Sequence, residues 1–517
     1  MNIYNAKQTR EIEAAVFSSG VSYLQMMEQA GQAVAEHVLN KNKEVSYKNK
    51  VVILCGRGNN GGDGLVVARR LCLEGWDVSV IFPGGISKTS DSVYMLEQLK
   101  QLSIFILDPS SSPDQEEICF SLIRSAQWIV DALFGIGFHG TIGDPYSRYI
   151  KAVEENSSAT VVSIDIPSGA HCDTGCVQGP CIKAHHTITF FTYKPAHLIY
   201  PAAEYCGKVF VKPLFDIHAL GQSISTSQYN FSFEEVKKWF PTRHANSHKG
   251  AFGKLLCLCG KVGMTGAAEL SAKAAMRCGV GLTYLITPKD ACSALSCKLT
   301  EPVLIPLDQS PEGTLSQQSI PAILEQLSSA SACLIGCGMG DTLHTQDILE
   351  AVLQHAKCPV VIDADGINAL SHHIDRIKQS TASIILTPHP GEMARLTGKP
   401  IAEIQANRLR TAKEFVQEFS VTLVLKGAGT IVATPDGRVW INSTGNPGMA
   451  KGGSGDVLAG MAAAFVAQGM EVGKAAAAAV YLHGLAGDRC AQRFSQHAML
   501  ASDLIQMLPD IFLDLEK

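Results

Sequence analysis

The sequence lacks the features that mark several common classes of protein. The 517 residues carry a formal net charge of −5, so no basic excess indicates nucleic acid or a membrane surface as partner. No apolar stretch approaches the roughly 20 residues needed to span a bilayer. Residues 1–8 show no basic segment leading into an apolar run, so we expect no signal peptide. These absences favour a cytoplasmic globular protein.

Cysteine usage also excludes common metal and redox sites. The chain has 16 cysteines but no C-x-x-C pair, which argues against zinc ribbons and thioredoxin-like centres. Free thiols fit a reducing compartment. One group between residues 171 and 186 would allow a metal site, although a loop with free thiols is the favoured interpretation. Its members are His171, Cys172, Cys176, Cys181, His185 and His186.

Length and apolar periodicity predict two α/β domains. A single core rarely grows beyond about 300 residues, and 46% hydrophobic with 18% charged residues suits a well-packed protein. Short apolar runs typical of buried strands alternate with helical patterns such as 65–73, which predicts parallel sheets covered on both faces. The predicted strands are 51–55, 78–82, 128–130 and 160–164, then 255–258, 282–286, 332–335, 360–362, 384–386 and 422–425.

A polar stretch at 218–228 interrupts this pattern and is typical of a linker. We therefore predict a first domain over 1–217, a linker over 218–231 and a second domain over 232–517.

The first candidate site follows the strand at 51–55. Gly56, Gly58 and Gly61 match G-x-G-x-x-G, a pattern whose glycines let backbone N–H groups approach a phosphate at a helix N-terminus. A dehydrogenase of the Rossmann type also needs an acidic residue at the end of the second strand. Asp77 precedes that strand, at its wrong end, so the ordinary dehydrogenase interpretation is rejected.

Two further loops support a ligand site in the first domain. Asp131 ends one predicted strand and Asp165 ends another. Because the carboxyl ends of parallel strands meet at one edge of the sheet, these loops converge with the glycine loop. A single such aspartate is more often a helix cap, but three converging loops favour function.

These motifs resemble the NAD(P)HX epimerase family, as does Met26–Gly31 in the first helix. The segments that carry the resemblance are Asn59–Gly64, Asp131–Gly135 and Asp165–Gly169. The resemblance implies a Rossmann-like, doubly wound αβα sandwich and a potassium ion held by Asn60, Asp131 and Ser168. It implies substrate contacts, with Asp165 also the candidate catalytic residue, from Asn59, Asn60, Gly61, Gly62, Asp63, Gly135, Ile136, Gly137, Phe138, His139, Gly140, Thr141 and Asp165. Ile136 stands where the family usually has Thr, which puts a side-chain phosphate contact there in doubt.

The second candidate site is the glycine-rich segment Gly445–Leu458, which leads into an apolar helix near Val457. Glycine amides at a helix N-terminus form an anion hole for phosphate. We expect the helix dipole to keep Asp456 ionised, and a carboxylate beside a phosphate can act as general base. The alternative is that Asp456 is only a residue of the first helical turn.

Three more segments follow predicted strands in the second domain. Residues 426–430 (Lys-Gly-Ala-Gly-Thr) can hold a nucleotide phosphate, and Asp363–Leu370 supplies acidic groups. Prolines flank His389 and stiffen its loop, which leaves a ligand role and a structural role equally open on the residues alone.

These segments, with Gly263–Ala268, resemble the NAD(P)HX dehydratase family of the ribokinase-like superfamily. The resemblance implies a ribokinase-like αβα domain, ADP as co-substrate and Mg²⁺. It implies substrate contacts from Ala267, Gly338, His389 and Asp456, and nucleotide contacts from Lys426, Gly427, Ala428, Gly429, Thr430 and Gly455. Lys451 departs from the small residue expected there, and its cation would either bind phosphate or point to solvent.

Together the two resemblances imply an enzyme that repairs hydrated nicotinamide cofactors, with NADHX or NADPHX and ADP as its small-molecule partners. Epimerisation of the R and S forms would precede nucleotide-dependent dehydration of the S form, and we expect a homo-oligomer. The anion hole alone equally fits a small-molecule kinase, and the first domain could be a nucleotide-sensing module.

Overall fold

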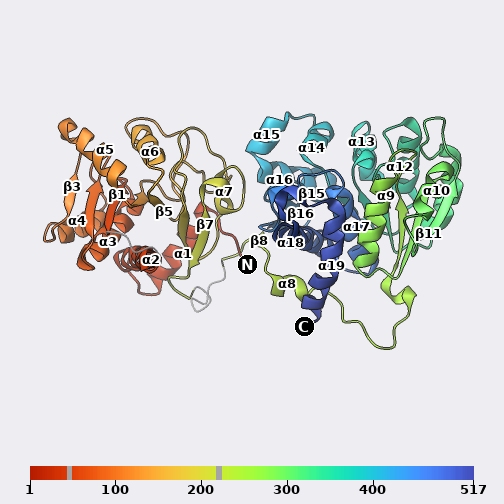
Figure 1. Cartoon of the computed structure of the whole chain (residues 1–517), viewed down its shortest axis with the longest axis horizontal. Helices are drawn as coiled ribbons and strands as arrows, with labels where there is room; N and C mark the ends of the chain where they lie inside the picture. The colour runs from red at the N-terminus through yellow and green to blue at the C-terminus, as the bar shows by residue number, and fades with distance from the viewer. Residues whose placement is uncertain (44–48, 217–223) are drawn as a thin grey trace. The chain divides into compact units, whose positions relative to one another are not determined.

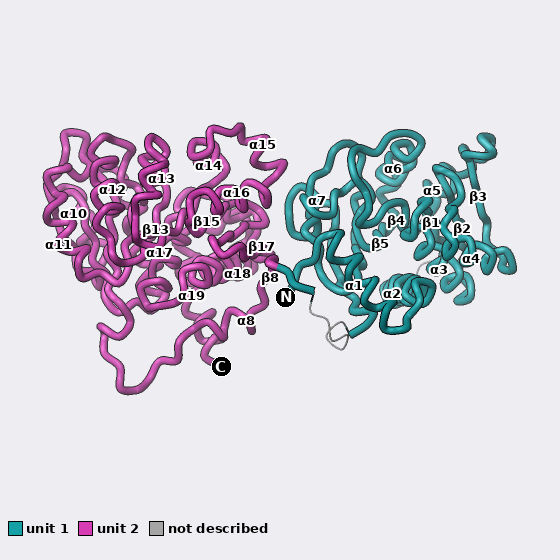
Figure 2. Tube along the Cα trace, turned by 180° about the vertical axis from the view of Figure 1, so that it is seen from behind, with its two compact units in different colours: residues 1–226 teal, residues 227–517 magenta. Residues whose placement is uncertain are grey.

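The computed structural model describes residues 1–43, 49–216 and 224–517, which form two compact units, residues 1–226 and 227–517 (Figure 2). Each unit is a sheet with helices packed against it (Figure 1). No helix among these residues is long and apolar enough to cross a membrane.

Unit 1 contains a seven-stranded, entirely parallel sheet in the order β3-β2-β1-β4-β5-β6-β7. Its strands are β1 (Lys50–Cys55), β2 (Asp77–Ile81), β3 (Phe105–Leu107), β4 (Trp128–Ala132), β5 (Thr160–Ile164), β6 (His186–Phe190) and β7 (Lys208–Lys212). Its helices are α1 (Ala6–Ser18), α2 (Tyr23–Lys43), α3 (Asn59–Leu73), α4 (Ser90–Leu99), α5 (Glu116–Ser125), α6 (Tyr146–Glu155) and α7 (Ala202–Tyr205).

Residues 51–55 of β1 are all apolar because both faces of the sheet are covered. Val51 and Ile53 belong to the core beneath α2, α3 and α4, whereas Val52 and Leu54 belong to the core beneath α5 and α6. The strand order reverses between β1 and β4, which is the point where open α/β sheets bind ligands. The predicted doubly wound fold is thus confirmed for unit 1.

Unit 2 contains a ten-stranded sheet in the order β11-β10-β9-β12-β13-β14-β15-β16-β17-β8. Its strands are β8 (Gln228–Asn230), β9 (Lys254–Leu258), β10 (Leu282–Pro288), β11 (Val303–Leu307), β12 (Ala332–Ile335), β13 (Val360–Ile362), β14 (Ile384–Leu386), β15 (Thr422–Leu425), β16 (Ile431–Ala433) and β17 (Val439–Ile441). Strands β9 to β15 pair in parallel, as predicted, but β16 is antiparallel to both β15 and β17. These last strands have three residues each, too short to show a pattern in the sequence.

Helices α9, α17, α18 and α19 build the large core of unit 2, and α12 packs between α11 and α13. The helices are α8 (Phe233–Lys237), α9 (Thr265–Arg277), α10 (Lys289–Ser296), α11 (Ile320–Leu327), α12 (Leu343–His355), α13 (Asp365–Ser371), α14 (Pro390–Thr397), α15 (Ile401–Ala406), α16 (Arg408–Phe419), α17 (Ser454–Ala467), α18 (Val472–Ala498) and α19 (Ala501–Glu516). The small residues of α17 and α9 allow close contact: a Cβ on Gly460 would lie 2.2 Å from the Ser271 carbonyl oxygen.

The segment between the units differs from the expected linker over 218–231. Residues 218–223 lie outside the described residues. The side chain of Thr226 donates a hydrogen bond to the Ile3 carbonyl in unit 1, whereas residues 228–230 form β8 beside β17 in unit 2. Backbone pairing with unit 2 therefore begins before residue 232.

Candidate active sites

The glycine segment of unit 1 is the start of a helix rather than a free loop. Helix α3 begins at Asn59, with Gly58 as its N-cap, several residues before the helix expected from 65–73. A Cβ on Gly56 would lie 1.8 Å from the Leu133 carbonyl oxygen, and one on Gly61 would lie 2.1 Å from the Gly56 carbonyl oxygen. Glycine is therefore required for this close packing. N–H groups at the start of a helix that have no intrahelical partner can bind an anion.

Asp131 forms a buried polar centre at the carboxyl end of β4. Its side chain is fully buried and accepts hydrogen bonds from Ser163 Oγ at 2.8 Å, Ser168 N at 2.8 Å and Ser168 Oγ at 2.5 Å. Ser168 Oγ in turn accepts from the Phe134 amide at 2.9 Å. Burial raises the pKa of Asp131, and its hydrogen bonds counter this only in part. A bound cation would favour the ionised carboxylate.

Asn60 lies beside the loop that Asp131 and Ser168 support. A Cβ on Gly135 would lie 3.3 Å from Asn60 Oδ1, while Asn60 Nδ2 is buried without a hydrogen-bond partner in the described structure. The three predicted potassium ligands therefore surround residues 133–135. Their carboxylate, hydroxyl and amide oxygens suit a hard cation.

Asp165 and Lys194 form a buried ion pair at the carboxyl end of the sheet. Lys194 Nζ lies 2.5 Å from Asp165 Oδ1, and Thr189 Oγ1 donates to the same oxygen at 2.8 Å. The Lys194 side chain is only 1% exposed. Burial alone would raise the pKa of Asp165, but the Lys194 ammonium and its hydrogen bond bring the pKa below its ordinary value, with smaller help from His197.

The backbone at Asp165 is also strained, with φ at 63°, a conformation that non-glycine residues rarely adopt. Sequence reasoning missed Lys194. The only signal was a lysine in an otherwise apolar stretch shortly after the strand at 186–190.

The segment 135–141 continues the loop that Asp131 and Ser168 support. Ile136 packs against an apolar cluster that includes Ile166 and Ala170, so the departure from Thr serves packing. His139 Nδ1 lies 3.0 Å from His171 Nε2.

The Cys and His residues between 171 and 186 do not gather around a metal. His171 pairs with His139, and His186 Nδ1 lies 2.8 Å from His37 Nε2. All 16 cysteines carry free thiols. Within residues 1–43, 49–216 and 224–517, the one group with ligand atoms close enough to hold a metal ion is Cys337, Asp363 and Asp456.

In unit 2, Asp363 and Lys426 meet at the carboxyl ends of β13 and β15. Asp363 Oδ1 accepts from Lys426 Nζ at 2.7 Å and from Thr387 Oγ1 at 2.6 Å. Glu392 Oε2 lies 3.8 Å from the same ammonium. Burial would lower the pKa of Lys426, but the two carboxylates raise it, so the ammonium stays charged. The sequence predicted Lys426 only as part of a loop that binds phosphate. In the structure its side chain points toward the carboxylates of Asp363 and Glu392.

Asp456 lies in the first turn of α17, beside this charged pair. Burial, and then the nearby Asp363 carboxylate, raise its pKa to about 6. Desolvation therefore makes Asp456 a weaker acid than an exposed aspartate, although a pKa of about 6 still leaves it mostly ionised near neutral pH, as expected. A pKa just below neutrality suits a general base better than a strongly acidic carboxyl. Burial similarly raises the pKa of Glu392 to about 7.

Glycines open the space between these groups. A Cβ on Gly455 would lie 3.3 Å from Lys426 Nζ and 3.7 Å from Asp363 Oδ2, so Gly455 faces the ion pair directly. A Cβ on Gly338 would lie 2.8 Å from that of Ala267, so these two predicted substrate contacts are neighbours.

Arg408 holds the segment 426–430 in place through hydrogen bonds to its backbone carbonyls. The sequence motifs did not predict this role. Its guanidinium donates to the carbonyls of Leu425 at 3.1 Å and Lys426 at 3.4 Å. A Cβ on Gly427 would lie 2.6 Å from Arg408 Nη1. Burial lowers the pKa of Arg408 to about 10, which leaves it charged. No sequence signal distinguished it from a surface arginine.

His389 is both a helix cap and a site residue. Its Nδ1 accepts hydrogen bonds from the backbone of Gly391 at 2.9 Å and Glu392 at 3.1 Å at the start of α14. Accepting at Nδ1 leaves the hydrogen of the neutral ring on Nε2. Burial, followed by Lys426 and Arg395, lowers the pKa of His389, so the neutral ring is favoured, and its Nε2 lies 3.4 Å from Glu392 Oε1.

The Lys451 ammonium is held by backbone carbonyl groups. Its ammonium donates to the carbonyl oxygens of His497 at 2.7 Å and Met499 at 2.6 Å, where it ties the glycine segment to the end of α18. Its role in the structure is therefore to anchor the segment.

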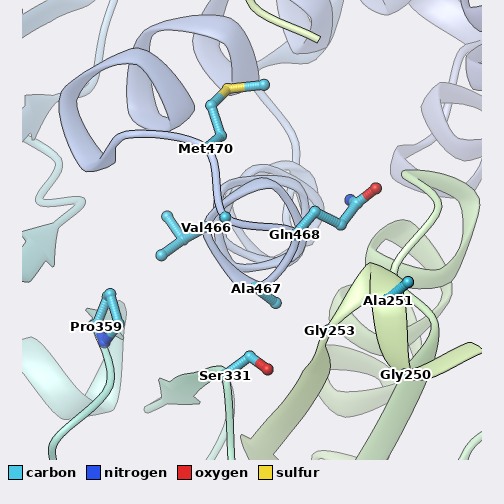
Figure 3. Close-up of a pocket in the computed structure, with 10 residues that line it drawn as sticks. Gly250, Ala251, Gly253, Ser331, Pro359, Val466, Ala467, Gln468 and Met470 are labelled. Carbon is cyan, nitrogen blue, oxygen red and sulfur yellow. The ribbon is translucent and has the colours of Figure 1, made fainter. Parts of the chain in front are cut away.

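One open cavity of unit 2, with a volume of about 480 Å³, lies away from this site (Figure 3). Gly253, Ser331 and Pro359 line it, and each immediately precedes a strand. It therefore lies at the amino ends of the strands, opposite the motifs, and none of its ten lining residues is titratable.

Family profiles match both units of the chain. The profile of the family described as YjeF-related protein N-terminus matches residues 23–196, and that described as NAD(P)H-hydrate dehydratase matches residues 255–510. A solved ribokinase-like superfamily protein from Enterococcus faecalis V583 is 28% identical with a TM-score of 0.50, over 56% of this chain and 97% of that one. This likeness supports the predicted ribokinase-like fold of unit 2.

Two relatives match nearly the whole chain. The bifunctional NAD(P)H-hydrate repair enzyme Nnr of Moorella thermoacetica is 37% identical, over 95% of this chain and 93% of the relative. The enzyme with the same name from Escherichia coli K12 is 34% identical, over 95% of this chain and 90% of the relative. The chain therefore belongs to the family of bifunctional NAD(P)H-hydrate repair enzymes.

Proposed function

We propose that unit 1 interconverts the R and S epimers of hydrated NADH and NADPH, and that unit 2 dehydrates the S epimer with ADP as co-substrate. Family membership supports the pair of activities. The observation that carries the dehydratase assignment is Asp456, a carboxyl with a pKa of about 6, beside the Gly455 amide and Lys426 at a helix N-terminus.

For dehydration, the β-phosphoryl group of ADP moves to the ring hydroxyl of the substrate, leaving AMP. Asp456 takes the hydroxyl proton, and the hydroxyl oxygen forms the new bond to phosphorus. The resulting phosphate then leaves with the C–O electron pair, and the neighbouring ring carbon gives a proton to the departing phosphate as the C–H electron pair forms the ring double bond. The N–H groups at the start of α17 and the Lys426 ammonium stabilise charge on the transferred group. Magnesium enters with the nucleotide phosphates as part of the co-substrate.

Further residues of unit 2 bind the reactants. We assign His389 to the substrate, together with Ala267 and Gly338, which are neighbours of each other. Residues 426–430, held by Arg408, bind the nucleotide.

For epimerisation, the first turn of α3 (Asn59–Asp63) and the segment 135–141 bind the substrate, with Asp165 at the reacting carbon. Asn60, Asp131 and Ser168 would hold a potassium ion, which would order residues 133–135 and offset the charge of Asp131. The Asn60 Oδ1 beside Gly135 and the buried Asp131 carboxyl, whose pKa burial raises and a cation would lower, support such a site.

These activities map onto the proposed domains 1–217 and 232–517. The cytoplasmic location and the homo-oligomer stay predictions. The kinase alternative lacks an independent observation, because the same anion hole serves both reactions.

Product analysis separates dehydration from kinase chemistry. The full chain is incubated with S-NADHX, with and without ADP, and the products are resolved by chromatography. NADH, AMP and phosphate in equal amounts are expected only with ADP. A stable phosphorylated dinucleotide would contradict the proposed function.

A further inference from the structure

Two carboxyl groups of unit 1 sit in opposite electrostatic surroundings. Asp165 is paired with the buried Lys194 at 2.5 Å and hydrogen-bonded to Thr189. Asp63, on α3, accepts no hydrogen bond from any residue that the structure describes, and its charged neighbours are the carboxyls of Asp165 and Glu13. Asp63 is half-buried, so a bound substrate can reach it.

These different surroundings shift the pKa values of Asp63 and Asp165 in opposite directions. Burial, then Asp165 and Glu13, raise the pKa of Asp63 well above its ordinary value. Burial would raise the pKa of Asp165, but the Lys194 ammonium outweighs burial, so the pKa lies below its ordinary value. The surroundings therefore favour the protonated form of Asp63 and the ionised form of Asp165. Pairs of groups with environments that differ in this way are typical of acid and base partners.

Building on the epimerase function proposed above, we propose that Asp63 is the proton donor of epimerisation, that Asp165 is the base, and that Lys194 is a positioning residue for Asp165. Neither a donor role for Asp63 nor any role for Lys194 follows from the sequence motifs.

The chemistry balances with these groups alone. The epimeric carbon of the hydrate carries a hydroxyl and is bonded to the ring nitrogen. Asp165 takes the hydroxyl proton, and the O–H electron pair forms the aldehyde C=O as the carbon–nitrogen bond breaks. Asp63 gives its proton to the nitrogen. After rotation of the aldehyde, nitrogen attacks its other face and both protons return, which yields the opposite epimer with its carbon-bound hydrogen retained.

The other charged groups near Asp63 and Asp165 do not change which of the two is the acid and which is the base. Glu13 on α1 faces both aspartates, and burial followed by Asp165 raises its pKa, which Lys194 and Arg10 counter in part. His197 donates from Nε2 to the Asp165 carbonyl at 2.8 Å, and burial lowers its pKa to about 4, so it is neutral. Lys194 is therefore the one cation in hydrogen-bond contact with Asp165 in the described structure.

The test uses the full chain and purified R-NADHX, with the epimers separated by chromatography and initial rates measured across pH. Wild-type kcat should rise with pH as Asp165 loses its proton and fall as Asp63 loses its own. Asp63→Asn should lower kcat by ~10²–10⁴-fold with little change in KM, and the alkaline fall should disappear. Asp77→Asn, at the opposite end of the sheet, is the matched control and should match wild type.

Lys194→Met should move the acidic limb to higher pH, because removing the ammonium leaves burial to raise the pKa of Asp165. Near-UV circular dichroism checks that this variant keeps its fold. In deuterium oxide the epimeric carbon should take up no deuterium. Wild-type kcat in Asp63→Asn, a change in KM alone, or deuterium at that carbon would overturn the donor assignment. Failure of wild type to convert the R epimer would instead contradict the epimerase function.

Discussion

Replacing Gly455 with alanine tests the anion hole of unit 2 without threatening the fold. The new Cβ would lie 3.3 Å from Lys426 Nζ, the far end of a flexible side chain that can shift by a few tenths of an ångström. Gly455 is the second residue of α17, where alanine gains up to ~1 kcal/mol over glycine in helix propensity. The variant should therefore be at least as stable as wild type.

The same methyl group occupies the space through which a phosphate approaches the helix amides. Losing one hydrogen bond to a charged phosphate costs ~1.5–3 kcal/mol. At 1.4 kcal/mol per tenfold, this corresponds to roughly 10- to 100-fold weaker ADP binding.

Gly452→Ala is the matched control, because a Cβ at that position would meet nothing within 4 Å. Isothermal titration with ADP and a thermal melt are measured on both variants. We expect weakened binding and an unchanged or raised Tm for Gly455→Ala, and wild-type values for Gly452→Ala. Wild-type ADP affinity in Gly455→Ala would refute the anion-hole reasoning.

Four further predictions concern the two sites. Asp456→Asn should lower dehydration by ~10²–10⁴-fold while ADP affinity stays near wild type; normal turnover would contradict its role as base. Wild-type dehydration should be weak below pH 6, where Asp456 is protonated, and should rise as pH increases through about 6, as a pH–rate profile would record. Arg408→Met should weaken ADP binding and lower Tm, because it removes the donors to the Leu425 and Lys426 carbonyls. An unchanged ADP affinity and Tm would show that residues 426–430 keep their conformation without Arg408. Replacing potassium with sodium should reduce epimerisation or the Tm of unit 1, and Asn60→Ala should remove that difference.

The sequence predicted the elements that strong, regular patterns encode. Continuous apolar runs such as 51–55 have two buried faces, so the predicted strands and their parallel pairing followed from these runs and their alternation with helical patterns. Seven strands were not predicted: β3, β6, β7, β8, β11, β16 and β17. Of these, β3, β8, β16 and β17 have three residues each, which is too few to display a period.

At the sites, glycine-rich helix starts and aspartates at strand ends were visible as motifs. The side chains that hold those motifs in place were not. Lys194 and Arg408 are buried cations whose partners come from residues distant in the chain or from backbone carbonyls, which no local pattern records. Lys451 shows the converse, since a cation within a phosphate-binding motif bonds to two carbonyls of a distant segment.

The central claim, that both units act on one metabolite, is tested most directly with racemic NADHX and ADP. Absorbance of regenerated NADH is followed to completion in wild type and in Asp165→Ala. Wild type should convert the whole racemate, because unit 1 supplies the S epimer as unit 2 consumes it, whereas Asp165→Ala should convert the S half rapidly and then slow sharply. Rapid, complete conversion by Asp165→Ala, or a halt at one half in wild type, would contradict the account.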